Sequence, residues 1–267
     1  NKHRKKDLDM KLDRYRSKKT GFQTGWWERV NDETREHFDI WENFNKNPAL
    51  ADEVQLDASE DVNNIIDNTK VPWVRIHDIS VPWTDIKREA YHLMETECFT
   101  DHRASGSGGW MSLCIHGMSS VHTNVPEDYN MPDRAEEELS GWTDIAKFAP
   151  LTKEWMQDEM LYDKFTRVRF MLLLPDGYIS PHADVDRIPG LGATNVAINN
   201  PDKCNLVMEE YGTMPFEPGT VFKINTGYRH AVWNRSDEPR VHMIFDGDQG
   251  VEFKKKVNKN YAKMFNV

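Results

Sequence analysis

After residue 70 the chain alternates apolar and polar residues in short runs, a pattern that predicts β-strands. Pro, Gly, Asn and Asp separate the runs, as expected for turns. The predicted strands are residues 73–77, 110–115, 166–174, 178–183, 193–198, 204–209, 213–217, 220–225, 230–234 and 240–246. So many short antiparallel strands are typical of a jelly roll or double-stranded β-helix. We therefore predict a mainly β, cupin-like barrel with flanking α-helices.

Two segments instead space their apolar residues as a helix does. The first begins at Thr84, as an N-cap, and continues to Met94; the second begins at Thr152 and passes through Met156. We expect both helices to pack on the outside of the sheet. Before the first strand, a polar segment with scattered Trp and Phe residues predicts short helices held to the body by aromatic side chains.

Length and pattern together predict the domain organisation. A chain of 267 residues can bury one sizeable core, and barrels of this size are usually one domain. We predict a basic and helical N-terminal extension at residues 1–70, packed on the body. The barrel domain then occupies residues 71–250, and a basic C-terminal tail occupies residues 251–267.

Composition limits the partners. The net charge of −10 argues against a general nucleic-acid binder, although residues 1–19 are locally basic. No apolar run is long enough for a membrane span and no signal peptide is visible, so we expect a cytoplasmic protein without a membrane partner. The odd number of Cys residues, at Cys98, Cys114 and Cys204, agrees with reduced thiols.

The residues that suggest chemistry lie between positions 181 and 240. His182 and Asp184 are two positions apart on a predicted strand, so their side chains point to the same side, about 6 to 7 Å apart, and can approach one metal ion. His230, on a later strand, supplies a third ligand. Two imidazoles and one carboxylate on one face of Fe(II) leave positions open for O₂ and a chelating co-substrate. The sequence therefore predicts an iron-dependent oxygenase.

A His-x-acid triplet alone is weak evidence, because a chain with 10 His and 44 acidic residues contains roughly one or two by chance. A second triplet, His37-Phe38-Asp39, lies in a polar, helix-like segment and is interpreted as surface. The order of the parts favours a metal site, because an apolar strand and a Pro-Asp-Gly turn precede His182.

Arg240 follows His230 after the turn-forming segment 236–239. If that turn closes a hairpin, Arg240 lies roughly five residues, about 16 Å, along the sheet from His230. The gap suits a five-carbon dicarboxylate that chelates iron at one end and meets the arginine fork at the other. We therefore predict 2-oxoglutarate as the co-substrate.

Residues from about 165 to 247 resemble the aspartyl/asparaginyl β-hydroxylase family of Fe(II)- and 2-oxoglutarate-dependent oxygenases, which includes free-proline cis-hydroxylases. The matching residues are Leu174-Pro175, Pro181-His182, Thr194-Asn195, Glu217-Pro218-Gly219, His230-Ala231-Val232-Trp233 and Arg240. The resemblance implies that His182 and His230 bind iron and that Arg240 binds the distal carboxylate of 2-oxoglutarate. It also implies hydroxylation of an unactivated C–H bond, with release of succinate and CO₂.

The chain departs from the family at several positions. The animal peptide hydroxylases have glycine where this chain has Asp184, so the complete triad is more similar to the small-molecule hydroxylases. Asn199 and Pro201 replace a basic residue and a histidine near the co-substrate of those peptide hydroxylases. The segment 185–192 is longer than in those relatives and is a candidate part of the substrate mouth.

Other polar residues on predicted strands are candidates for binding. Arg169 alternates with apolar neighbours, so it either clamps a substrate carboxylate or pairs with an acidic residue. Trp110, Ser112 and His116 are expected to share one strand face, which either lines the pocket or belongs to an ordinary core strand. Asn195 is a candidate co-substrate residue that orients a neighbouring group.

Three alternative functions stay open at this stage. A cupin-like metal dioxygenase would keep the barrel and ligands without needing 2-oxoglutarate. A non-catalytic barrel would bind a ligand at a degenerate metal site. A nucleic-acid-directed oxygenase would use the basic residues 1–19 as an anchor. The substrate is a small molecule or a peptide, and the sequence specifies neither the oxidised carbon nor the oligomeric state.

Overall fold

The computed structural model describes residues 32–48, 71–96, 99–102, 107–121, 126, 130–184 and 193–265. The strands are β1 Trp73–Ile76, β2 Thr100–Asp101, β3 Ser107–Gly117, β4 Gly141–Trp142, β5 Tyr162–His182, β6 Thr194–Ala197, β7 Cys204–Met208, β8 Gly212–Thr213, β9 Val221–Ile224, β10 His230–Asn234 and β11 Arg240–Gln249. The helices are α2 Asp32–Glu42, α4 Trp83–Glu95, α5 Glu136–Leu139, η4 Asp144–Phe148, α6 Pro150–Glu159 and α7 Val251–Phe265. Within these ranges no helix is long and apolar enough to cross a membrane.

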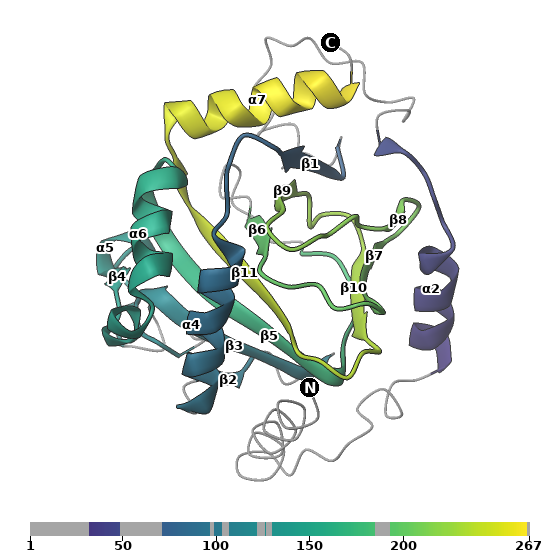
Figure 1. Ribbon diagram of the computed structural model, residues 1–267, viewed down its shortest axis with the longest axis horizontal. Helices are drawn as coiled ribbons and strands as arrows, with labels where there is room; N and C mark the ends of the chain where they lie inside the picture. Colours follow the sequence, from purple (N-terminus) through teal and green to yellow (C-terminus); the bar gives the residue numbers. More distant parts are fainter. Residues whose placement is uncertain are drawn as a thin grey trace.

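The strands form one 11-stranded antiparallel sheet, and the long strand β5 joins its two halves, which are called the first and the second sheet below. The first half of β5 pairs with β11, and that sheet continues through β6 and β9 to β1, with β3 on the other side of β5. Its second half pairs with β10, followed by β7 and β8. The two sheets curl over a shared interior, as Figure 1 shows. The chain thus forms the predicted double-stranded β-helix, and most runs predicted as strands correspond to β1, β3, β5 to β7 and β9 to β11. The run predicted at 213–217 is a strand only at its first residue, because β8 ends at Thr213.

Side chains alternate between the two faces of the sheet and so form two hydrophobic cores, an outward core beneath the helices and an interior core inside the barrel. On β5, Phe170 and Leu172 face outward, toward the helices, whereas Leu173 faces the barrel interior. On β11, Val241 and Met243 face outward in the same way. The outward core also contains the apolar faces of α4, α6 and α7, which lie on that side of the sheet (Figure 1). Each large apolar side chain buried in this way contributes about 1.5–3 kcal/mol relative to exposure.

Helix α2 covers the outer face of the second sheet. Phe38 and Trp41 are buried against Val207 of β7 and Ala231 of β10. The aromatic anchoring predicted for the N-terminal extension is confirmed for these two residues. Glu42, at the end of α2, accepts a hydrogen bond from Asn205 Nδ2 at 2.6 Å. The strand that carries His230 is therefore supported from behind by a packed helix.

The starts of α4 and α6 differ from the prediction. Helix α4 begins at Trp83 with no side-chain cap, so Thr84 is not its N-cap. Helix α6 begins at Pro150, before Thr152, and Glu89 of α4 accepts hydrogen bonds from the backbone amides of Leu151 and Thr152, each at 2.9 Å. Local sequence could not reveal this cap, because the carboxylate comes from another helix.

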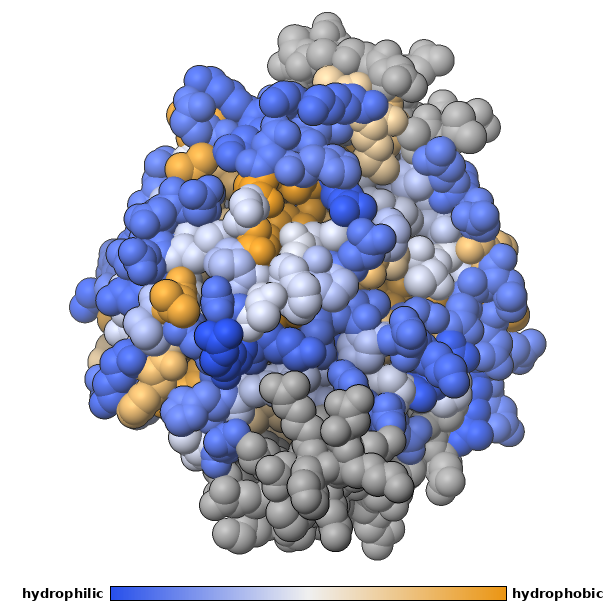
Figure 2. Space-filling model, viewed as in Figure 1, coloured by the Kyte–Doolittle hydropathy of each residue, from blue (hydrophilic) through white to orange (hydrophobic). Residues whose placement is uncertain are grey.

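Residues 251–265, expected only as a basic tail, form the packed helix α7. Phe253, Val257 and Tyr261 are fully buried in the outward core. Lys254 and Lys255 are exposed, whereas the ammonium group of Lys256 donates to the carbonyl oxygen of Asp78 at 2.8 Å. Figure 2 shows α7 as a hydrophilic ridge with apolar residues visible beneath it.

The Pro-Asp-Gly turn marks the place where β5 passes from one sheet to the other. On β3, Gly108 lies opposite Tyr178 and Trp110 opposite Leu173, so residues 174–177 of β5 loop out of the ladder. Gly177 is required there, because a Cβ atom would lie 2.7 Å from the carbonyl oxygen of Leu174. Strand β5 continues through this loop and stays antiparallel to β3 on both sides of it.

The predicted hairpin between His230 and Arg240 is wrong. Strands β10 and β11 do not pair with each other; both run antiparallel to β5, one after the other. His230 lies opposite His182, and Arg240 lies opposite Leu173. The 16 Å separation along one hairpin therefore does not apply, because the two residues belong to facing sheets that share one interior.

Asn234 holds this crossing together. Its amide nitrogen donates to the carbonyl oxygens of Leu173, Leu174 and Glu238 at 3.0, 3.2 and 2.8 Å. Its amide oxygen accepts from the backbone and hydroxyl of Ser236. The side chain is fully buried.

Replacing Asn234 with Ala should lower the free energy of unfolding by about 2–4 kcal/mol, because buried backbone carbonyls lose their donor. Urea unfolding followed by circular dichroism measures the change. The control Ser236→Ala, which removes one hydroxyl that contacts the same amide, should cost about 1 kcal/mol or less. Equal losses in the two variants would show that Asn234 does not hold the crossing.

Candidate active site

A β-bulge places His182 on the interior face. Val232 lies opposite Ile179 and His230 lies opposite His182, so β5 has one more residue than β10 in this interval. Ile179 and Val232 both face the barrel interior. In a regular strand His182, three positions after Ile179, would fall on the outer face, because strand side chains alternate. The bulge therefore brings both predicted histidine ligands to the same side.

The two imidazoles lie together, with ring centroids 4.4 Å apart. Nδ1 of His182 is 2.8 Å from the carbonyl oxygen of Ser180, and Nδ1 of His230 is 2.9 Å from that of Tyr228. In each case Nδ1 donates to the carbonyl two residues earlier. These hydrogen bonds place the proton of each ring on Nδ1, so Nε2 is the nitrogen that would bind a metal. Metal-binding histidines usually have such a hydrogen bond at their other ring nitrogen.

Asp184 approaches this pair from the end of β5. Its Oδ1 lies 3.7 Å from Nε2 of His182, and its backbone amide donates to the carbonyl oxygen of Thr226 at 2.8 Å. Donor atoms about 2.1 Å from an octahedral ion lie roughly 3 Å apart, so this spacing is somewhat wide. Accordingly, across the described residues no three His, Cys, Asp or Glu side chains already converge at metal-binding distance. The structure brings the predicted ligands together in pairs, His182 with His230 and His182 with Asp184.

Arg240 is buried in the same interior, only 4% exposed. Among the described residues, no carboxylate lies within ion-pair distance of its guanidinium. Burial lowers the pKa of Arg240 to about 10, so the group stays charged at neutral pH. The guanidinium carbon lies 5.7 Å from the centre of the Phe216 ring. A buried cation without an anionic partner is costly, and a bound carboxylate would remove that cost.

Two polar residues extend inward from Arg240. Nε of Arg240 is 3.0 Å from Nε2 of His242, and Nδ1 of His242 is 2.7 Å from Oδ1 of Asn195. His242 and Asn195 are 0% and 5% exposed. Sequence analysis named Asn195 but missed His242. The available signal was its position, because residue i+2 on a strand shares the face of residue i.

Asn199 holds the backbone on both sides of Arg240. Its Oδ1 accepts a hydrogen bond from the amide of Val241, and its Nδ2 donates to the carbonyl of Pro239 at 2.8 Å. Its amide therefore fixes the start of β11. The segment 185–192, a predicted part of the substrate mouth, lies outside the described residues.

Arg169 lies on the interior face, opposite Ile244 of β11 and Cys114 of β3. Its side chain is 11% exposed, and its Nη2 is 3.5 Å from Oδ2 of Asp246. Arg167 shares that oxygen at 3.4 Å. Nε of Arg169 is buried without a hydrogen-bond acceptor. The acidic neighbour expected from the sequence is therefore present. It is Asp246, whose carboxylate contacts both Arg169 and Arg167.

The predicted face on β3 is only partly correct. Trp110 and Ser112 lie opposite Leu173 and Met171, on the interior side with Arg169. His116 does not share this face, because the register shifts between Cys114 and His116. Its ring instead meets Trp142 on the outer side, with centroids 5.0 Å apart. His116 is therefore a core residue outside the barrel interior.

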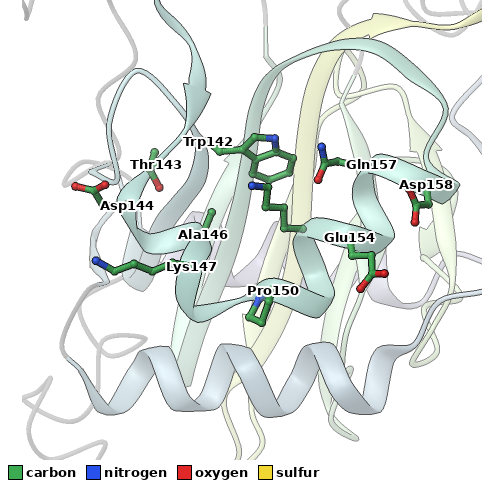
Figure 3. Close-up of a pocket in the computed structure, with 10 residues that line it drawn as sticks. Trp142, Thr143, Asp144, Ala146, Lys147, Pro150, Glu154, Gln157 and Asp158 are labelled. Carbon is green, nitrogen blue, oxygen red and sulfur yellow. The ribbon is translucent and has the colours of Figure 1, made fainter.

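A groove of about 500 Å³ lies on the helical side of the molecule, between η4 and α6 (Figure 3). Trp142 forms one wall, and the ammonium group of Lys153 lies 5.4 Å from the centre of its ring. The rim mixes charges of both signs, including Asp144, Lys147 and Glu154. None of the predicted site residues lines this groove.

A double-stranded β-helix with two imidazoles and a nearby carboxylate in its interior has the fold and the ligand types of a non-haem Fe(II) oxygenase. The chain belongs to the aspartyl/asparaginyl β-hydroxylase family, whose model matches residues 81–249, well over half of the sequence. It is thus an oxidoreductase of the dioxygenase class. No curated protein sequence matches the chain.

Three solved structures show a weak likeness. A prolyl-4-hydroxylase from Pseudomonas putida is 12% identical with a TM-score of 0.40, covering 71% of this chain and 100% of its own. A viral collagen prolyl hydroxylase from Paramecium Bursaria Chlorella virus-1 is 14% identical with a TM-score of 0.39, covering 67% and 97%. A prolyl hydroxylase from Trichoplax adhaerens is 12% identical with a TM-score of 0.42, covering 72% and 89%. TM-scores this low do not inform the site.

Stability should fall as the pH drops below about 6.5, because burial lowers the pKa of both His116 and His242. In that range the unfolded chain binds protons on these rings while the folded chain does not, so protons favour unfolding. Each ring contributes at most about 1.4 kcal/mol per pH unit. Urea unfolding at pH 7.5 and pH 5.5 measures the slope.

His116→Phe provides the control, because a phenyl ring can pack against Trp142 and Phe165 without titrating. This variant should lose part of the pH dependence while it keeps most of the stability at pH 7.5. An unchanged slope in the variant would mean that His116 takes up its proton in the folded state.

Proposed function

We propose that this hydroxylase binds Fe(II) through His182, Asp184 and His230 and holds 2-oxoglutarate through Arg240. The observation that carries the proposal is the buried guanidinium of Arg240, which has no carboxylate partner among the described residues and shares an interior with two oriented imidazoles. The residue types fit the group, because two imidazoles and one carboxylate suit Fe(II) and leave room for a chelating acid and O₂.

In this proposal the protein binds and orients, and bound iron together with 2-oxoglutarate and O₂ would supply the oxidising power for an unactivated C–H bond, with one oxygen atom going to the substrate and the other to succinate as CO₂ is released. The carbonyls of Ser180 and Tyr228 fix the imidazole tautomers of His182 and His230. The side chains of His182 and Asp184 are 29% and 31% exposed. The Asp184 carboxylate would shift toward the two imidazoles when a cation binds. Arg240 would hold the far carboxylate of the co-substrate.

Purified protein supplied with Fe(II), O₂ and 2-oxoglutarate should form succinate. His230→Ala and Asp184→Ala should each lower this rate, by at least about 100-fold and 10-fold, because each removes an iron ligand. Anaerobic Fe(II) titration provides a second measurement, since both variants should bind iron more weakly. The control is His92→Ala, which removes an exposed imidazole on α4. Iron binding that is unchanged in both ligand variants would overturn the proposed metal site.

Arg240→Met should raise the KM for 2-oxoglutarate by about 100-fold, because a bidentate charged contact in a buried site is lost. Arg88→Met, which removes an exposed arginine on α4, serves as the control. An iron dioxygenase that does not use 2-oxoglutarate would consume O₂ without it and would be indifferent to Arg240. A barrel that only binds a ligand would consume no O₂ at all.

For the substrate, we propose a free amino acid or a peptide side chain whose carboxylate is bound by Arg169. The support is the deep burial of Arg169, its buried Nε without an acceptor, and the fact that it shares its ion-pair partner Asp246 with Arg167. Trp110 and Ser112 lie on the same interior face and would form the wall beside it. The alternative of a nucleic-acid substrate relies on residues 1–19, which lie outside the described residues.

A mass-spectrometric screen of free and N-acetylated amino acids for a gain of one oxygen should find substrates with a carboxylate. Arg169→Met should raise the KM for such a substrate about tenfold or more, while succinate formation without substrate stays unchanged. Arg169→Lys, which keeps the charge, should lose less. Arg167→Met is the matched control, because it also contacts Asp246 but is less buried. Equal KM values for the Arg169 and Arg167 variants would rule out the clamp.

A further inference from the structure

The barrel interior contains a connected row of polar side chains, Asn195, His242 and Arg240, surrounded by apolar residues. His242 lies in register between Met171 of β5 and Ala197 of β6. The ring of Phe216 packs edge-on against His242, with centroids 4.7 Å apart. His242 has no exposed surface, so its ring nitrogens must be satisfied within the protein.

The chemistry of the neighbours selects one tautomer of His242. Arginine has only N–H donors, and two of them face the ring, Nε at 3.0 Å from Nε2 and Nη2 at 2.8 Å from Nδ1, so the acceptor Oδ1 of Asn195 beside Nδ1 decides between the tautomers. A neutral ring then carries its proton on Nδ1, which donates to Oδ1 of Asn195 at 2.7 Å. Nε2 is then the ring nitrogen that accepts from Nε of Arg240. Burial and the charge of Arg240 both lower the pKa of His242, which keeps the ring neutral.

His242 covers one edge of the arginine fork. Nε and Nη2 form one edge of a guanidinium, and both lie against His242, at 3.0 Å from Nε2 and 2.8 Å from Nδ1. Because Nδ1 donates to Asn195, the contact of Nη2 with Nδ1 is not a hydrogen bond. The edge formed by Nη1 and Nη2 is the pair of parallel donors that remains for a carboxylate.

We propose that His242 is a positioning residue: held in one tautomer by Asn195, it fixes the Nε edge of Arg240 and presents the Nη1–Nη2 edge to the distal carboxylate of the co-substrate. This inference rests on the proposed role of Arg240. The remaining neighbours cannot replace His242. Phe216 offers no acceptor in its ring plane, and the thiol of Cys204 is a weak one. Without His242 the guanidinium would have several orientations to lose on binding.

The test is direct binding of 2-oxoglutarate to Mn(II)-loaded protein without O₂, measured by isothermal titration calorimetry. His242→Phe keeps the ring volume but has no acceptor, and should weaken binding by about 10- to 100-fold. His242→Gln restores an acceptor for Nε and should stay within about threefold of the wild type. In turnover, His242→Phe should raise the KM for 2-oxoglutarate and leave kcat nearly unchanged. Met243→Leu, on the outer face of the same strand, is the matched control.

Succinate binding to metal-free protein isolates the carboxylate contact, because succinate keeps the distal carboxylate and lacks the 2-oxo group. His242→Phe should weaken succinate binding by the same factor as 2-oxoglutarate. If both ligands bind the folded Phe variant as tightly as the wild type, or if Phe and Gln are equally impaired, the positioning role is overturned. If wild-type protein binds neither ligand and Arg240→Met changes nothing, the proposed function itself is overturned. Asn195→Leu, which should weaken binding by loss of tautomer control, replaces His242→Phe should that variant not fold.

Discussion

The passage of β5 from one sheet to the other is the constraint on which the candidate site depends. The first half of the strand aligns β11 and therefore Arg240, and the second half aligns β10 and therefore His230. Because one continuous strand sets both registers, the imidazoles and the guanidinium cannot shift independently. The looped-out residues 174–177 and the amide of Asn234 fix the crossing itself. Local hydrogen bonds thus determine the relation between two distant parts of the site.

The barrel maintains a charge that its described residues do not neutralise. Transferring a guanidinium into an apolar interior costs several kcal/mol unless an anion accompanies it. For Arg240 the outward core and the interior core, rather than an ion pair, must offset this cost. Such an arrangement is expected where binding matters more than stability, because the ligand restores the missing interaction. The lowered pKa of Arg240 has the same origin, since burial disfavours its charged form.

Sequence predicted the strands well, because a period of two is visible in any half-buried strand. The sequence could not predict the places where one extra residue in a strand moves the following side chains to the other face of the sheet. The register shift before His116 could not be seen, so His116 was expected on the same face as Trp110 and Ser112, although it packs on Trp142. The bulge before His182 was equally invisible, yet the relation of His182 to Asp184 depended only on their own spacing. The predicted hairpin was wrong because the sequence of a turn does not reveal which strands the two flanking strands pair with.

The two interior arginines are held in different ways, and the difference bears on what each can bind. Arg169 shares the single carboxylate of Asp246 with Arg167, whereas Arg240 contacts only neutral groups among the described residues. Both face the interior from neighbouring strands, four β5 positions apart, which is about 14 Å of strand. Guanidinium groups therefore lie at two places along one sheet, with the imidazole pair on the facing sheet. That distribution suits a reaction in which two separate carboxylate-bearing molecules must meet beside one cation.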